Sequence, residues 1–324
     1  MPIVDKPLEE LLVYQGRNPV PEDMDQFWED SLNEMRSVDR QVELVEAPFQ
    51  APGVTCYDLY YTGVRNARIH CQLLVPKDLK EKAPAVIQFH GYTGWTGDFS
   101  GKLGWTACGF VVAAMDCRGQ GGYSEDTGGM KGTTFKGHIV RGLDDCPENL
   151  LFRHIFLDTA ELADIVMGLT FVDETRVGVM GGSQGGGLSL ACAALEPRVA
   201  KVHATYPFLC DYQRVWEMDL AKGAYEELST FFRNFDPTHE REGEIFRRLG
   251  YIDVQHLAKR IKGEVVMATG LMDTVCPPST QFAAYNKITS KKSYLIYPDY
   301  GHEALRGIND KTFAYFFDFL KEEQ

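Results

Sequence analysis

Residues 176–187 read Arg-Val-Gly-Val-Met-Gly-Gly-Ser-Gln-Gly-Gly-Gly, and this stretch decides the fold. The apolar run before Ser183 is typical of a β-strand, and residues 188–195 after it are compatible with a helix. A serine in the pattern Gly-x-Ser-x-Gly between a strand and a helix is typical of a nucleophile elbow, because the sharp turn has no room for neighbouring Cβ atoms. We therefore predict that the Ser183 hydroxyl is exposed on a strained turn. The N–H groups of the following helix would lie behind it.

A serine nucleophile needs a base and an acid, and both can be found downstream in the order Ser, acid, His. Asp273 opens the loop after a strand-like run that ends at Gly270. His302 follows a second strand-like run that ends at Pro298. All three residues then lie beyond the carboxyl ends of strands, which is where open parallel sheets bind ligands. The sequence predicts a Ser183, Asp273, His302 triad.

Each of these residues also has an ordinary structural explanation. A serine between glycines is usually a turn residue, an aspartate before Thr-Val-x-Pro usually caps a loop, and a lone histidine after glycine is usually exposed. Their joint occurrence, in the required order and each at a strand end, favours catalysis. Asp299 is the rival acid, since it lies three residues before His302. It does not, however, occupy a strand-end loop of its own.

An oxyanion hole needs a second donor from a loop after an earlier strand. Residues 83–95 read Ala-Pro-Ala-Val-Ile-Gln-Phe-His-Gly-Tyr-Thr-Gly-Trp, a buried-type strand that ends near His90. We predict that the backbone N–H groups of Tyr92 and Gln184 form the hole and that Tyr92 also contacts substrate. For His90 a structural role, hydrogen-bonded under the loop, is favoured over a catalytic one.

Bulky aromatic residues lie on or near the loops that follow the catalytic-edge strands, among them Tyr92, Trp95, Trp105 and Phe208. We expect them to wall a small acyl pocket, in which each methylene added to the acyl group must displace packed side chains.

The wider pattern alternates strand-like and helix-like runs, which indicates an α/β fold with a mostly parallel central sheet and flanking helices. Strand-like runs occur near 57–61, 68–75, 84–89, 110–116, 176–181, 202–206, 264–269 and 293–297. The first two are expected to form an antiparallel edge.

We interpret residues 1–324 as a single α/β-hydrolase domain with two additions. The first is an N-terminal helical extension over about 1–40, in which residues 21–36 place apolar side chains at helical spacing. The second is a mainly helical insertion over about 208–262, which is a natural position for a cap. Residues 120–151 are predicted to form a long loop.

Composition and charge exclude several classes of function. The 324 residues carry a net charge of −13 and no basic run, which argues against nucleic-acid binding. The sequence contains no run of eighteen apolar residues that would indicate a membrane span. Its first residues do not resemble a secretory signal. Eight cysteines without a Cys-x-x-Cys pair are expected to be buried free thiols in a reducing cytoplasm. No phosphate-binding, dinucleotide-binding or zinc motif is complete, so neither a cofactor nor a metal is predicted.

Three motifs resemble those of the acetyl xylan esterase and cephalosporin C deacetylase family, the seventh carbohydrate esterase family of the α/β-hydrolases. They are Arg-Gly-Gln-Gly-Gly at 118–122, Gly-Gly-Ser-Gln-Gly-Gly at 181–186, and His302-Glu303. The Arg-Gly-Gln motif after a strand, combined with Ser-Gln-Gly at the elbow, is more specific than the elbow pattern alone. The resemblance covers nearly the whole chain, from the helix that contains Asp25 to the last helix.

This resemblance implies a triad of Ser183, Asp273 and His302, an oxyanion hole from the amides of Tyr92 and Gln184, and a serine esterase mechanism. It implies that the substrates are acetylated xylo-oligosaccharides and related acetyl esters such as cephalosporin C. It also implies a ring-like homohexamer whose subunits shield the active sites.

Two other classes of function stay open at this point. One is a different hydrolase on the same fold, such as a peptidase or a lactone hydrolase, which the triad alone does not exclude. The other is a non-catalytic binding protein.

Overall fold

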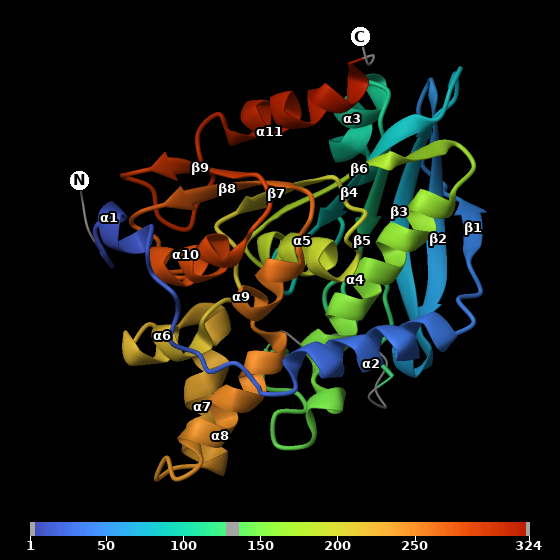
Figure 1. Cartoon of the computed structure of the whole chain (residues 1–324). Helices are drawn as coiled ribbons and strands as arrows, with labels where there is room; N and C mark the ends of the chain where they lie inside the picture. Colours follow the sequence, from blue (N-terminus) through green and yellow to red (C-terminus); the bar gives the residue numbers. More distant parts are fainter. Residues whose placement is uncertain (1–3, 128–135, 322–324) are drawn as a thin grey trace.

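The computed structural model describes residues 4–127 and 136–321, and within them a single sheet crosses the molecule from β9 to β1 (Figure 1). Its strands lie in the order β1-β2-β3-β5-β4-β6-β7-β8-β9. Their bounds are β1 Glu43–Glu46, β2 Val54–Gly63, β3 Ala67–Pro76, β4 Ala83–Phe89, β5 Val111–Met115, β6 Val172–Gly182, β7 Lys201–Thr205, β8 Glu264–Gly270 and β9 Lys292–Tyr297.

The strands β5, β4, β6, β7, β8 and β9 run parallel to one another. At the other end of the sheet, β1, β2 and β3 pair antiparallel, and β3 pairs antiparallel with β5. The mostly parallel α/β-hydrolase architecture is thus confirmed. The predicted edge was wrong in one respect, because β1 and not β2 is the outer strand. Its four residues, Glu-Leu-Val-Glu, are all exposed, so the sequence carries no alternation of buried and exposed positions that would indicate a strand.

Helices cover both faces of the sheet because successive side chains of each strand point to opposite sides. On β4, Ala85, Ile87 and Phe89 join the larger core cluster, whereas Val86 joins a second cluster with Trp105. In Figure 1, α3 and α11 lie over one face, and α4, α5 and α10 lie over the other. These helices are α3 Leu103–Ala107, α4 Leu151–Gly168, α5 Gln184–Leu195, α10 Pro278–Lys287 and α11 Ile308–Phe316.

The N-terminal extension packs on α4 and α10. Its short helix α1 spans Leu8–Leu11, and its amphipathic helix α2 spans Met24–Ser37. The apolar residues of α2 that set the predicted helical spacing are all buried, namely Met24, Phe27, Trp28, Leu32 and Met35. Since α2, α5 and β6 all pack on α4, most of α4 is buried, including its charged residues Arg153, Asp158 and Glu161.

The insertion between β7 and β8 is mainly helical, as expected. It contains α6 Tyr212–Glu217, α7 Glu226–Phe235, α8 Glu242–Leu249 and α9 Val254–Leu257, with short 3₁₀ turns between them. Of the long loop predicted over 120–151, residues 128–135 lie outside the described part of the chain, and α4 begins at Leu151. None of the helices in the described ranges has the length and apolar character needed to cross a bilayer.

The interpretation as one domain with two additions stays a prediction. Free thiols were expected to be buried, and six of the eight cysteines are. Cys108 and Cys146 are instead exposed. Cys108 follows the last residue of α3 and lies in the turn before β5, where the chain reverses at the surface.

Candidate active site

The turn between β6 and α5 has the geometry expected of a nucleophile elbow. Ser183 has φ 56° and ψ −120°, a conformation that is unfavourable for a residue with a side chain. Glycine is required on both sides of Ser183 because other backbone atoms lie where a Cβ atom would be. A Cβ on Gly185 would lie 2.1 Å from the carbonyl oxygen of Phe89, and one on Gly181 would lie 2.5 Å from the Gly185 backbone. The turn therefore stays tight only because these positions lack side chains.

The structure brings the three predicted triad side chains together. His302 Nε2 lies 3.0 Å from Ser183 Oγ, and His302 Nδ1 lies 2.8 Å from Asp273 Oδ2. Because an ionised carboxylate only accepts hydrogen bonds, Nδ1–H donates to Asp273 and the serine hydroxyl donates to Nε2. The other carboxylate oxygen, Oδ1, accepts the backbone N–H groups of Val275 and Cys276, each at 2.8 Å. Asp273 is fully buried, so these donors compensate for its desolvation.

Asp299 does not hold the position of the acid. It is exposed, whereas the partner of His302 Nδ1 is the buried Asp273. The imidazole of His302 also lies against the ring of Tyr206, with ring centroids 4.6 Å apart. Burial raises the pKa of the Tyr206 phenol, and the charge of Asp273 raises it further. Sequence reasoning did not single out Tyr206, which directly follows β7.

The predicted oxyanion loop after β4 lies against the elbow. Gln184 Nε2 donates to the His90 carbonyl oxygen at 3.4 Å, and the first N–H groups of α5, that of Gln184 included, have no partner within the helix. His90 takes the structural role expected of it. Its Nε2 accepts the Cys117 N–H at 3.0 Å and its Nδ1–H donates to the Gly91 carbonyl at 2.7 Å. Burial lowers the pKa of His90, which favours the neutral ring.

The Arg-Gly-Gln motif connects this loop to the elbow, a role that the sequence did not reveal. Gln120 Oε1 accepts the Thr93 N–H at 2.9 Å, and the side-chain amides of Gln120 and Gln184 bond to each other at 2.8 and 3.0 Å. Arg118 pairs with Asp158 on α4 through two hydrogen bonds and is fully buried. The buried pair of Gln120 and Gln184 therefore joins the residue after Tyr92 to the start of α5. This fixes the positions of the two segments whose amides are predicted to form the hole.

Cys276 is a second neighbour that sequence reasoning missed. Its thiol lies against Ser183 and is fully buried, and burial, followed by the charge of Asp273, raises its pKa. Among the described residues, Asp273, Cys276 and His302 are the group whose potential ligand atoms, all within 4.8 Å of one another, could hold a metal ion. Two of the three already bond to each other, and His302 Nε2 faces Ser183. The expectation that no metal or cofactor is needed stays a prediction.

The sequence also placed four aromatic side chains around a small acyl pocket, and the structure supports only part of that set. The rings of Tyr92 and Phe208 lie 5.6 Å apart, and the Phe208 N–H bonds to the Ser183 carbonyl at 3.0 Å. Trp105 was placed there wrongly. It stacks on Phe313 of α11 at 3.7 Å, on the opposite face of the sheet. Trp95 is 59% exposed and thus is not a packed pocket wall.

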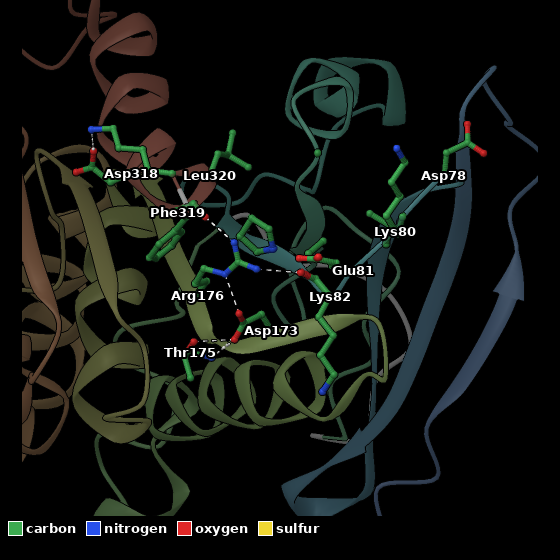
Figure 2. Close-up of a pocket in the computed structure, with 15 residues that line it drawn as sticks. Asp78, Lys80, Glu81, Lys82, Asp173, Thr175, Arg176, Asp318, Phe319 and Leu320 are labelled. Carbon is green, nitrogen blue, oxygen red and sulfur yellow. Dashed lines mark hydrogen bonds and ion pairs between the residues drawn. The ribbon is translucent and has the colours of Figure 1, made fainter. Parts of the chain in front are cut away.

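A large surface hollow lies away from this site. It has a volume of about 910 Å³ and is lined by the starts of β4 and β6 together with the last described residues of the chain. Figure 2 shows Arg176 at its base, bonded to Asp173 and to the backbone of Lys82 and Phe319. None of the triad residues lines it. Since reactive side chains gather at the other end of these strands, we place the site there.

The chain matches one protein family and several solved structures. The sequence profile of the family described as Acetyl xylan esterase (AXE1) matches residues 1–319. The crystal structure of acetyl xylan esterase 1 from Thermoanaerobacterium sp. is similar with a TM-score of 0.95 and 61% identity, over 98% of this chain and 100% of that one. An acetyl xylan esterase from Paenibacillus sp. is similar with a TM-score of 0.89 and 34% identity, over 97% and 99% of the two chains.

A curated relative is larger. The acetyl esterase Axe7A of Xylanibacter ruminicola is 31% identical over 300 residues, which are 89% of this chain. The chain spans 64% of that protein's length.

Proposed function

The chain belongs to the acetyl xylan esterase family of carboxylic ester hydrolases, and we propose that it removes acetyl groups from acetylated xylo-oligosaccharides with Ser183 as nucleophile. The observation that carries this proposal is the chain of hydrogen bonds from Ser183 Oγ through His302 to Asp273, at 3.0 and 2.8 Å. Those distances suit a serine whose proton is taken by an oriented imidazole. The similar proteins are acetyl xylan esterases, which supports acetyl esters as the substrate class.

The mechanism proceeds through an acetyl-enzyme. His302 takes the Ser183 proton as Oγ attacks the acetyl carbonyl carbon, and Asp273 stabilises the resulting imidazolium. The N–H groups of Tyr92 and Gln184 receive the developing oxyanion, each contributing about 3 kcal/mol to lowering the barrier. The tetrahedral intermediate then expels the sugar alkoxide, which accepts the proton from His302. Water, deprotonated by His302, attacks the acetyl-enzyme, and acetate leaves with Ser183 reprotonated.

The finer features of the proposal are substrate range, assembly and location. Related acetyl esters such as cephalosporin C are included in the substrate range, and the active unit is a homohexamer. The family resemblance supports both. An exposed apolar edge around β1, with Val42, Leu44, Val45 and Phe49 each at least 40% exposed, offers a surface for self-association. A cytoplasmic location is supported by all eight cysteines being free thiols.

A direct test profiles the purified chain on acetylated xylo-oligosaccharides, polymeric acetylated xylan, cephalosporin C and a chromogenic acetate ester, measuring released acetate. The proposal expects acetate release from the oligosaccharides. Hydrolysis of the chromogenic ester without release from any sugar would contradict the substrate assignment. No turnover of any ester by a folded protein would contradict esterase activity itself.

A further inference from the structure

The side chain of Tyr92 is tied to the helical insertion. Its phenol O–H donates a hydrogen bond to Glu227 Oε1 on α7. Glu227 is buried, with 5% of the residue exposed. Tyr92 thus connects the loop after β4, which carries the predicted oxyanion donor, to a helix that is distant in sequence.

The same carboxylate holds a third segment. Glu227 Oε2 accepts the backbone N–H groups of Ile139 and Val140 at 2.7 and 3.2 Å. Burial raises the pKa of Glu227, while the phenol and these N–H donors lower it. The Tyr92 phenol and backbone N–H groups of a second loop therefore converge on one buried carboxylate, and these donors would lose their partner if Glu227 moved.

The ring of Tyr92 packs against a residue that bonds to the backbone of the nucleophile. Its centroid is 5.6 Å from that of Phe208, whose N–H bonds to the Ser183 carbonyl at 3.0 Å. On the other side the Tyr92 ring meets His138 edge to face at 5.2 Å. Phe208 is supported in turn by Tyr225, with centroids 4.4 Å apart. The Tyr92 ring thus belongs to an aromatic cluster next to the elbow, and rotation about its two side-chain torsions is the motion that could displace it.

We propose that Glu227 is a positioning residue that pins the Tyr92 ring and thereby restricts the site to short acyl groups. The inference rests on the proposed esterase function and extends it to acyl-chain selection. An acyl chain longer than acetyl must displace the ring. Displacement breaks the phenol hydrogen bond and leaves a buried carboxylate short of a donor, which costs more than moving an unbonded ring.

Tyr92→Phe tests this effect, because it keeps the ring, the backbone N–H and the bonds from Ile139 and Val140 to Glu227. It also removes the acceptor of the His138 N–H, 3.3 Å from the phenol oxygen, whereas a change at Glu227 leaves that acceptor in place. We expect kcat/KM for butyrate relative to acetate p-nitrophenyl esters to rise on the order of tenfold, as loss of one hydrogen bond to a charged group allows. Glu227→Leu should raise the ratio similarly. In the double variant the two effects should not add, because both remove the same bond.

Glu226→Gln is the matched control. Glu226 directly precedes Glu227 on α7 but is exposed and paired with Lys136 at 2.6 Å, so its substitution should leave the ratio at the wild-type value. All rates are measured well below each variant's melting temperature.

A butyrate to acetate ratio in Tyr92→Phe within twofold of wild type would overturn the inference, as would equal losses on both esters. Either result can be distinguished from failure of the proposed function, because in that case the wild-type enzyme would not hydrolyse the acetate ester. If Glu227→Leu does not fold, Tyr92→Phe decides the question alone.

Discussion

Ser183 has a strained backbone and a hydroxyl that bonds to His302, so it combines the two features expected of a nucleophile. We expect Ser183→Ala to fold with an unchanged melting temperature, since only a hydroxyl is removed. Its kcat on a chromogenic acetate ester should fall by about a millionfold, as for other triads that lose their nucleophile. A serine-directed phosphonate should label Ser183 in the wild type, and chelators should not alter the rate.

Substantial residual turnover by Ser183→Ala, after contaminating esterase has been removed by repeated purification, would rule out the serine mechanism. Labelling at another residue would do the same.

Asp273 and Asp299 offer a second test at the residue scale. Asp273→Asn should lower kcat by about 10⁴-fold, because the amide presents N–H where Nδ1–H needs an acceptor and so favours the wrong tautomer. Asp299 is exposed, so Asp299→Asn is the matched control and should change kcat little. Steady-state kinetics on one acetate ester measures both. The reverse ranking would show that the acid is misassigned.

At the residue scale, the sequence is most informative where the signal is local. Ser183 was identified from five consecutive residues, and Asp273 and His302 from the ends of strand-like runs. What Glu227, Gln120 and Cys276 contact could not be predicted, because their partners come from distant segments that only the folded sheet brings together. The preference for Asp273 over the nearer Asp299 also came from the sequence, because Asp273 follows a strand-like run of its own.

At the scale of an element, α4 carries a buried carboxyl, Glu161, that is fully shielded from solvent. Burial raises its pKa to about 8, and the neighbouring charge of Asp158 also raises it. Arg40, 3.2 Å away, offsets this in part. Since the folded-state pKa exceeds the unfolded one, the stabilising contribution is complete below about pH 4.5 and is lost as pH rises to about 8.

We therefore expect Glu161→Gln to lose less stability than wild type between pH 5 and pH 9, by a few kcal/mol in order of magnitude. Denaturant unfolding at both pH values measures this difference. Glu174→Gln, which removes an exposed carboxyl, should follow the wild-type profile. Parallel profiles for wild type and Glu161→Gln would show that Glu161 carries its charge without penalty in the folded protein.

Elements were predictable when they were long and periodic. The helix α2 was located from its apolar spacing, and eight strands from their apolar runs. The four-residue strand β1 escaped because all its residues are exposed. Trp105 was misplaced for a different reason, since position after a catalytic-edge strand does not say which face of the sheet the next helix covers.

At the scale of the whole molecule, the prediction concerns the proposed homohexamer and its effect on substrate size. A closed ring with inward-facing sites would act as a size filter, because a polymer cannot enter where an oligosaccharide can. If the proposed hexamer forms, light scattering should give about six times the 36.5 kDa of one chain. Short acetylated xylo-oligosaccharides should then be hydrolysed much faster than intact acetylated xylan.

The matched substrate for that comparison is the same xylan cut by an endoxylanase, so that acetyl content is identical and only chain length differs. Faster acetate release from the cut xylan, together with a hexameric mass in solution, supports the size filter. A monomer in solution with equal rates on cut and intact polymer would remove the ring and its filter. The triad would be unaffected by that outcome, because Ser183, His302 and Asp273 all come from one chain and bond to one another within it.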